Sequence, residues 1–224
     1  GGSGGGSEDL GVELKKLTIW TYNCRGLNDT EGNSSKRDSL MNAFKDTTSA
    51  HGHKLPDIIM LQETHANEEL MKKIRKAWGK GEVCGTETSS SSKGCCILIS
   101  PKLNVTVEMA IADKEGRWCF MVLKTKTQSE DRDAGCTFSV FNMYAPNVTG
   151  NIKKNFFKDV LTAAPMLPNV IIGGDINCII NPSLDNNKKT QNYNVSGRKE
   201  WLQALTPSHC DVYRTRHPNP KKPH

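Results

Sequence analysis

Several short apolar segments, rich in β-forming residues, end abruptly in a polar residue or a short polar turn. A run of about four to eight apolar residues bounded in this way predicts a buried strand. Two glycines separate the last run from the acid that follows it, and glycine lets the backbone turn sharply and approach a ligand closely. The segments are 17–22, 57–61, 137–143 and 170–172, and the polar residues that follow them are Asn23, Glu63, Tyr144, Asp175 and Asn177.

Amphipathic segments lie between these predicted strands. Asn67 is a favourable N-cap for a helix that runs to Trp78, with apolar residues on one face and basic residues on the other. A second helix is predicted over 152–164, and a shorter helical face over 38–50. Strands mixed with covering helices predict an α/β layered fold.

The polar residues at the strand ends form the candidate site. Residues at the ends of neighbouring strands converge on one crevice if the strands run compatibly. Two carboxylates, two amides and a phenol offer oxygen ligands to a hard divalent cation and hydrogen bonds to phosphate oxygens. Each residue by itself has a simpler interpretation: Glu63 as a solvated loop residue, Asn23 as a turn residue and Tyr144 as a packing residue. The combination is what indicates a functional site.

The composition favours a reduced intracellular protein with an anionic partner. The longest apolar runs are far shorter than the roughly 20 residues that cross a bilayer, so we expect no membrane span. The eight cysteines lie mostly in or beside strand-like runs and include no CxxC pair, which argues against disulfides and a structural zinc site. A net charge of +6, with Lys and Arg concentrated over 181–224, favours nucleic acid.

The first residues of the chain have the composition of a flexible linker. Gly1 to Ser7 read GGSGGGS, which is typical of an engineered Gly/Ser linker. We therefore interpret 1–16 as a linker and polar lead-in, and we expect a fusion partner upstream of Gly1. The folded domain is predicted to occupy 17–224.

Motifs along the chain occur in the order and rough spacing of one known family. They are 22–27 (YNCRGL), 61–65 (LQETH), 94–97 (GCCI), 113–117 (DKEGR), 142–147 (NMYAPN), 173–178 (GGDINC) and 211–214 (DVYR), followed by His217 and Pro218. With them, the chain resembles the endonuclease/exonuclease/phosphatase superfamily, which includes the apurinic endonucleases. Within that superfamily it is similar to the endonuclease domain of LINE-type (non-LTR) retrotransposons.

The resemblance implies a four-layered α/β sandwich, in which two packed mixed β-sheets are flanked by helices. It makes Glu63 the principal metal carboxylate with Asn23 beside it, and Mg²⁺ the expected ion, with Mn²⁺ as a substitute. Asp175 would orient or deprotonate the attacking water. Tyr144 and Asn177 would hydrogen-bond the phosphate or the transition state. Asn147 is implied to touch the DNA backbone. Arg25 and Arg117, which lie in the motif segments, are predicted to contact the DNA backbone or to support the site, with a salt bridge or a place at the edge of the core as the alternative.

The implied reaction is hydrolysis of one strand of double-stranded DNA. It leaves a 3′-hydroxyl that primes reverse transcription of a retroelement, so the implied partners are DNA and the reverse transcriptase domain of the parent polyprotein. The implied location is the nucleus. Two alternatives stay open: an abasic-site repair endonuclease of the same superfamily, and a catalytically incomplete module that binds DNA or another partner.

The last residues of the chain depart from the family pattern. Family members continue with further strands and a Ser-Asp-His motif whose Asp and His belong to the active site. This chain ends at His224 without that motif. We therefore expect an endonuclease domain that is C-terminally incomplete by about 40–60 residues, judged from usual domain size. The isolated chain is then expected to be inactive or poorly folded.

Overall fold

The computed structural model describes residues 17–28, 35–45, 56–88, 92–126, 135–163, 167–181, 196–205, 209–212 and 215. The predicted linker and lead-in, 1–16, and the basic end of the chain, 216–224, lie outside the described residues. The strands are β1 (Ile19–Asn23), β2 (Ile58–Gln62), β3 (Glu82–Gly85), β4 (Cys95–Ile99), β5 (Val105–Ala112), β6 (Trp118–Thr125), β7 (Thr137–Tyr144) and β8 (Val170–Asp175). The helices are α1 (Ser35–Lys45), α2 (Glu68–Trp78), α3 (Asn151–Ala163) and α5 (Arg198–Leu205).

The first sheet has the strand order β1-β2-β4-β3. β1 runs parallel to β2, and β4 pairs antiparallel with both β2 and β3. Every residue of β2 is buried, as expected for a strand that is apolar on both faces and covered on both sides. Because β1 and β2 are parallel, their carboxyl ends lie at the same edge of the sheet, with α1 as the crossover between them.

The second sheet has the strand order β5-β6-β7-β8. β5, β6 and β7 form an antiparallel meander, with a shift of register in β5 between Val107 and Met109. β8 then pairs in parallel with β7, after the crossover helix α3. The second sheet therefore also ends in a parallel pair whose carboxyl ends coincide, and this pair carries Tyr144 and Asp175 in register.

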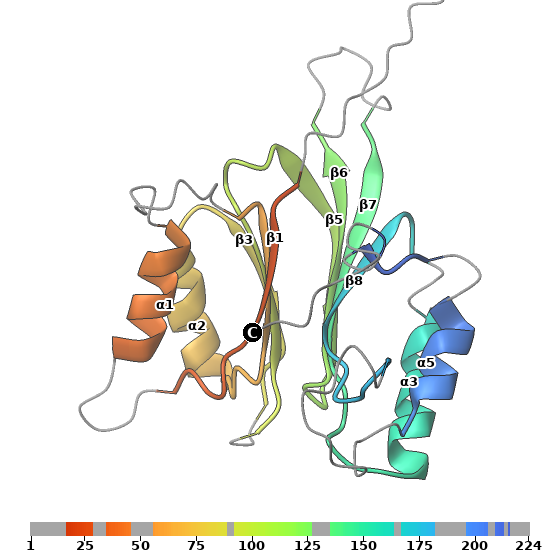
Figure 1. Cartoon of the computed structure of the whole chain (residues 1–224). Helices are drawn as coiled ribbons and strands as arrows, with labels where there is room; N and C mark the ends of the chain where they lie inside the picture. The colour runs from red at the N-terminus through yellow and green to blue at the C-terminus, as the bar shows by residue number, and fades with distance from the viewer. Residues whose placement is uncertain are drawn as a thin grey trace, which may run out of the picture.

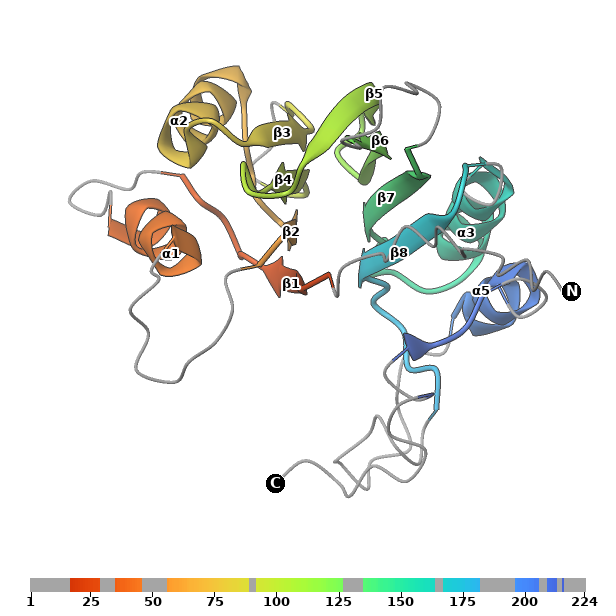
Figure 2. The same ribbon diagram turned by 90° about the horizontal axis from the view of Figure 1, so that it is seen from above.

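The two sheets pack face to face, and the helices cover their outer faces (Figures 1 and 2). α1 and α2 lie over the first sheet, whereas α3 and α5 lie over the second. A cluster of buried residues that includes Met60, Ile97 and Met121 fills the space between the sheets. Separate apolar clusters join each sheet to its own helices. The predicted four-layered α/β sandwich is confirmed.

Helix α2 shows how the sequence determines one of these elements. The Asn67 side chain accepts a hydrogen bond from the Leu70 backbone N–H at 2.9 Å, so the predicted N-cap is confirmed. Gly79 ends the helix at a φ of 84°, a conformation that favours glycine. Trp78 is buried against the first sheet, where its indole N–H donates to the Ile99 carbonyl at 2.8 Å.

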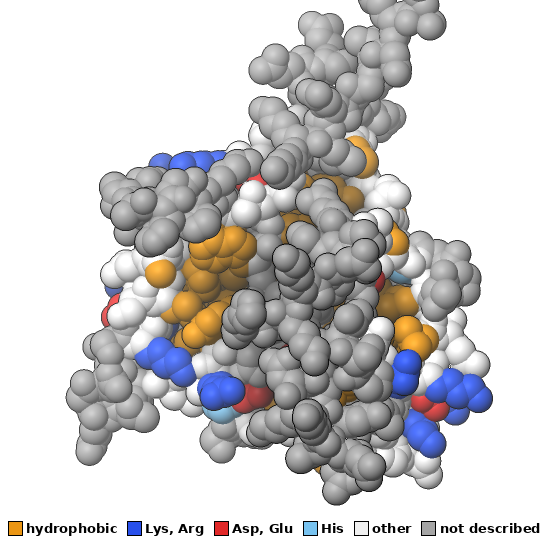
Figure 3. Space-filling model, in the orientation of Figure 1, with side chains coloured by type: hydrophobic (Ala, Val, Ile, Leu, Met, Phe, Trp, Pro, Cys, Tyr) orange, Lys and Arg blue, Asp and Glu red, His pale blue; other side chains and the backbone are white. Residues whose placement is uncertain are grey.

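Strands β1 and β8 lie side by side at the same side of the sandwich (Figures 1 and 2). Among the described residues, no strand pairs with the outer edge of either one. Ile19, Trp20 and Tyr22 of β1 are exposed, and Figure 3 shows hydrophobic side chains gathered on this side of the molecule. The absence of C-terminal strands that would adjoin these edges stays a prediction.

The cysteines are free thiols, as predicted. Burial raises the pKa of Cys95, Cys96 and Cys119 well above the usual range, and raises the pKa of Cys24 to about 12. Fully buried thiols behave here as small hydrophobic side chains. None of the helices among the described residues has the length and apolar character that a membrane crossing requires.

Candidate active site

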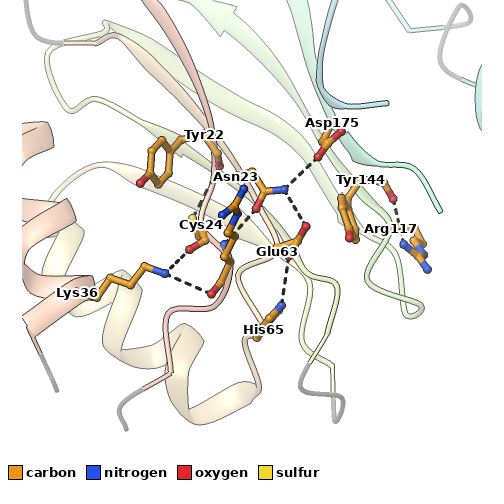
Figure 4. Close-up of polar contacts among 10 residues, drawn as sticks. Tyr22, Asn23, Cys24, Lys36, Glu63, His65, Arg117, Tyr144 and Asp175 are labelled. Atoms are coloured by element: carbon orange, nitrogen blue, oxygen red, sulfur yellow. Dashed lines mark hydrogen bonds and ion pairs between the residues drawn. The ribbon is translucent and has the colours of Figure 1, made fainter. Parts of the chain in front are cut away.

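The carboxyl ends of the two parallel strand pairs meet, and they bring four of the predicted site residues together (Figure 4). The Asn23 side-chain nitrogen donates to a Glu63 carboxylate oxygen at 2.8 Å and to an Asp175 carboxylate oxygen at 3.0 Å. The side-chain oxygen of Asn23 accepts from the Arg25 backbone N–H at 3.1 Å, which fixes the orientation of the amide. Tyr144 lies beside this group. Residues from both sheets therefore build one polar cluster.

Glu63 follows directly after the buried strand β2. Its backbone has a φ of 51°, a left-handed conformation that is uncommon outside glycine. Backbone hydrogen bonds hold this turn on both sides: Gly26 donates to the Glu63 carbonyl at 2.7 Å, and Thr64 donates to the Gly94 carbonyl at 3.2 Å. The unusual conformation persists because neighbouring chain segments hold it, and it points the carboxylate at Asn23.

Asp175 ends β8 after the two glycines noted in the sequence. Gly174 has a φ of 128°, and a Cβ atom there would lie 2.0 Å from the Met143 carbonyl oxygen, so only glycine fits. One carboxylate oxygen of Asp175 accepts from the Asn177 backbone N–H at 2.9 Å, while the other accepts from Asn23. The turn after β8 therefore orients the carboxylate toward the first sheet.

Tyr144 contributes a neutral phenol to the cluster. Burial is the main cause that raises the pKa of Tyr144 to about 12, and the hydrogen bond and negative charge of Glu63 add to it. The Arg117 guanidinium lies over the Tyr144 ring, 5.2 Å from its centre, and opposes that rise. The phenol is thus a hydrogen-bond donor at neutral pH.

A buried pair of amides joins the two sheets just behind the site, one residue before Glu63 and two before Tyr144. Gln62 of β2 donates to the Asn142 side-chain oxygen at 2.8 Å. The Asn142 side-chain nitrogen donates to the carbonyls of Leu61 and Cys96, at 2.8 and 2.9 Å. Both amides are buried, so these bonds compensate for the loss of water. They hold the strands that carry Glu63 and Tyr144 in a fixed relative position.

The other predicted residues lie around this cluster. Asn177 donates from its side chain to the Ala145 carbonyl at 2.8 Å, and its amide group carries a second proton that can donate to a ligand. Arg117 lies against Tyr144, and Arg25 is exposed at a φ of 50°, directly after the Asn23 turn. Asn147 is exposed beyond the end of β7. Contact of Arg25, Arg117 and Asn147 with DNA stays a prediction.

Two residues near the site were not singled out from the sequence. The His65 Nε2 atom lies 3.8 Å from a Glu63 carboxylate oxygen, and burial is the main cause that lowers the pKa of His65. The Lys36 ammonium donates to the Cys24 and Arg25 carbonyls, so α1 supports the turn after β1 (Figure 4). His65 adjoins Glu63 in the LQETH motif, and this proximity was an available signal. A helical lysine such as Lys36 gives no comparable signal.

The donor set fits a hard divalent cation. Glu63 and Asp175 offer carboxylate oxygens, which are ligands that Mg²⁺ prefers. Asn23 faces both carboxylates with its amide nitrogen, so its amide oxygen would join them as a ligand once the amide turns over. Mg²⁺ is usually bound through one or two carboxylates together with substrate phosphates and water. Among the described residues, no three His, Cys, Asp or Glu side chains are grouped to hold a metal ion.

Comparison with solved structures shows the same fold in nucleases. The catalytic domain of Xenopus laevis APE2 is 20% identical, with a TM-score of 0.61 over 92% of this chain and 73% of that one. An AP endonuclease from Archaeoglobus fulgidus is 18% identical, with a TM-score of 0.63 over 92% of this chain and 76% of that one. An endonuclease/exonuclease/phosphatase family protein from Bacteroides thetaiotaomicron is 15% identical, with a TM-score of 0.52 over 84% of this chain and 68% of that one.

Comparison of sequences agrees with the fold. No curated protein matches the chain. The sequence profile of the Endonuclease/Exonuclease/phosphatase family matches residues 20–220, a span that contains every element of both sheets from Trp20 onward. The chain therefore belongs to the endonuclease/exonuclease/phosphatase family, whose members are hydrolases that act on phosphodiester bonds.

Proposed function

We propose that this chain is a magnesium-dependent DNA endonuclease that nicks one strand of a duplex. The observation that supports it most directly is the convergence of Glu63 and Asp175 on a single Asn23 amide, at 2.8 and 3.0 Å, from strands of different sheets. Two carboxylates brought within reach of one nitrogen would repel each other without a cation or a donor between them. A phosphodiester and its counterion are a natural ligand for such a group.

A divalent ion would be held by the Glu63 carboxylate, with the Asn23 amide oxygen beside it after the amide turns over. Nucleases of this superfamily generally use divalent metal ions. When bound, Mg²⁺, or Mn²⁺ in its place, neutralises phosphate charge and polarises the P–O bond.

The protein side chains then have separate tasks. The Asp175 carboxylate, already oriented by Asn23 and the Asn177 backbone, accepts a proton from the attacking water. The water oxygen bonds to phosphorus, the bond from phosphorus to O3′ breaks, and O3′ takes up a proton to become a hydroxyl. The Tyr144 phenol and the second Asn177 amide proton donate to phosphate oxygens as negative charge develops there.

The surface around the cluster suits a polyanion. The chain has a net charge of +6, and Arg25 is exposed beside Asn23. We propose that Arg25, Arg117 and Asn147 contact the backbone of double-stranded DNA on either side of the cut phosphate. Contacts of this kind neutralise phosphates, so binding weakens steeply as salt concentration rises.

We further propose that the parent protein is a LINE-type retroelement polyprotein. The motifs LQETH over 61–65 and GGDINC over 173–178 support this assignment. In such an element the new 3′-hydroxyl primes reverse transcription by the reverse transcriptase domain, in the nucleus. A purified chain of 17–224 tests only the nicking step, whereas priming needs the full polyprotein.

Incubation of the purified chain with supercoiled plasmid and Mg²⁺ tests the nicking. Open-circular product from the wild type, with none from Glu63→Ala or Asp175→Ala, would establish the nuclease and would refute the expectation that the isolated chain is inactive. A duplex with one abasic site, run beside the plasmid, distinguishes a repair endonuclease, which would cut that site far faster than intact DNA. If the plasmid binds but is not nicked, a chain extended with the family-type C-terminal segment decides the matter. Recovery of nicking would support an incomplete nuclease, and continued inactivity would leave a DNA-binding module.

A further inference from the structure

Lys153 is a completely buried lysine near the start of α3. Lysine is rarely buried in full unless its ammonium has a partner. The stem lies under Gly197, whose hypothetical Cβ atom would be 3.4 Å from the Lys153 Cγ atom. The ammonium donates to the backbone carbonyl of Asn177, in the turn that follows β8. The buried Lys153 ammonium therefore binds one backbone oxygen close to Asp175.

The Asn177 turn is held from three directions. Its backbone N–H donates to the Asp175 carboxylate at 2.9 Å, and its side chain donates to the Ala145 carbonyl at 2.8 Å. Its carbonyl accepts from Lys153. Asn177 has a φ of 48°, a left-handed conformation that costs energy and needs such anchors. Of the three, only the bond from Lys153 ties the turn to the helical layer.

The charges around Lys153 agree with this arrangement. Burial is the main cause that lowers the pKa of Lys153, while the neighbouring acidic groups of Cys178 and Asp175 oppose it. A lysine that contributed packing alone would be served as well by methionine, without the cost of a buried ammonium. The hydrogen bond to the Asn177 carbonyl is an interaction that the ammonium makes and a methionine could not.

We propose that Lys153 is a positioning residue, which fixes the turn 175–177 through the Asn177 carbonyl and so aims the Asp175 carboxylate at the reacting phosphate. The assignment rests on the proposed nuclease function for its effect on rate. The mechanical part, that Lys153 orders the turn, does not need catalysis to be observed.

Replacement with an apolar side chain of similar length tests the proposal. Lys153→Met removes the ammonium, and Lys153→Arg keeps a donor at that place. The exposed neighbour Lys154 provides the matched control, Lys154→Met. For each variant, hydrogen exchange of the Asn177 amide is measured against the amides of β2, and nicking is measured as kcat and KM.

In Lys153→Met we expect the Asn177 amide to exchange at least about tenfold faster while the β2 amides are unchanged, because only the turn is loosened. We expect kcat to fall about 10- to 100-fold at a nearly constant KM, since small misplacement of a reacting group has costs of this order. Lys153→Arg should recover part of both losses, and Lys154→Met should resemble the wild type in exchange and in kcat.

Three outcomes would overturn the proposal: unchanged exchange at Asn177 in Lys153→Met, faster exchange of all amides together, or an equal effect from Lys154→Met. If the wild type does not nick DNA, the nuclease function fails instead, and the exchange of Asn177 still decides whether Lys153 orders the turn.

Discussion

The β1-α1-β2 unit and the β7-α3-β8 unit share one topology, yet they hold their carboxylates differently. In each, a helix connects two adjacent parallel strands, and site residues follow or end the strands. Glu63 follows β2, an interior strand that is buried throughout and bonded on both sides. Asp175 ends β8, a half-buried strand with β7 as its described neighbour in the sheet.

The difference teaches that the sheet alone does not suffice to place both acids. The turn at Glu63 is held by backbone bonds to chain segments on both sides. On the β8 side the Asp175 backbone is tied to the strand β7, through the Ala145 N–H at 2.8 Å, and the rest of the support comes from the Asn177 turn and Lys153. We expect the β8 side to be the more easily disturbed half of the site.

The largest effect is expected from replacing the two carboxylates, one in each half of the site. Glu63→Gln and Asp175→Asn should each lower the nicking rate about 10²- to 10⁴-fold, the range found for groups that transfer protons or stabilise charge in the transition state. Residues that work as a unit are non-additive, so the double variant should be little worse than the poorer single one. Plasmid nicking rates of the three variants measure this. Losses that multiply would show that the two acids act independently.

The next effect tests what joins the halves. Asn142→Leu leaves the Leu61 and Cys96 carbonyls buried without this donor, whereas the Gln62 amide loses one partner and keeps Thr21 and Met60. We expect a loss of about 2 kcal/mol or more in the free energy of unfolding, at roughly 1 kcal/mol or more for each orphaned carbonyl. Denaturant unfolding measures the loss.

The control for Asn142 lies at the exposed end of the same network. Thr21 contacts the Gln62 side chain through its hydroxyl but is exposed, so Thr21→Val should cost less than about 1 kcal/mol. Equal losses at the two positions would mean that burial of the amide pair is not what connects the sheets.

A smaller effect tests the β8 side by itself. Gly174→Ala places a Cβ atom 2.0 Å from a backbone oxygen at a φ of 128°, and should cost about 1–3 kcal/mol of stability together with part of the nicking rate. At the neighbouring Gly173 a Cβ atom would meet the Met60 sulfur at 2.5 Å, which is a flexible side chain. Gly173→Ala should therefore cost only about 1 kcal/mol. Thermal unfolding of both variants measures the two losses of stability. An equal loss would argue that Gly174 has no stricter need for glycine than Gly173.

The smallest effect concerns pH on the β2 side. The fold lowers the pKa of His65, chiefly by burial, so the unfolded chain takes up its proton at a higher pH than the folded one. The stability contributed by neutral His65 is present above the usual histidine pKa of about 6.5 and is lost as pH falls below it. Unfolding at pH 7 and pH 5 should show a smaller acid-induced loss in His65→Gln than in the wild type. The same loss in both would remove His65 as the cause.

The strands that carry the site were predictable because their signal is local. The apolar runs before Asn23 and Glu63 end one residue before the strands do, and the run before Asp175 ends three residues before the end of β8, because the strand includes the two glycines and the acid. The short strand β3 and the helix α5 were not predicted. Trp201 and Leu205 of α5 pack against the apolar cluster of the second sheet and α3, where Trp201 contacts Phe157, and such long-range packing leaves little local trace.

The contents of the site were predictable in kind but not in detail. Asn23, Glu63, Tyr144 and Asp175 converge as the motifs suggested. The supporting contacts were hidden, because a lysine in a helix usually faces solvent and nothing in its sequence neighbourhood marks Lys36 or Lys153 as a partner of a distant turn. Which strands become neighbours across the two sheets is likewise a property of packing.

The buried thiols give the molecule its own reporter of transient opening. Cys95, Cys96 and Cys119 are fully buried and have raised pKa values, whereas Cys210 is exposed. An alkylating reagent needs an accessible thiolate, so it should modify Cys210 at once and the three buried thiols only when the structure opens. Cys95 and Cys119 lie in the cluster between the two sheets, and Cys96 lies between the first sheet and its helices. The rate of slow labelling at Cys95 and Cys119, followed by mass spectrometry without any engineered probe, would time how often the two sheets part under native conditions.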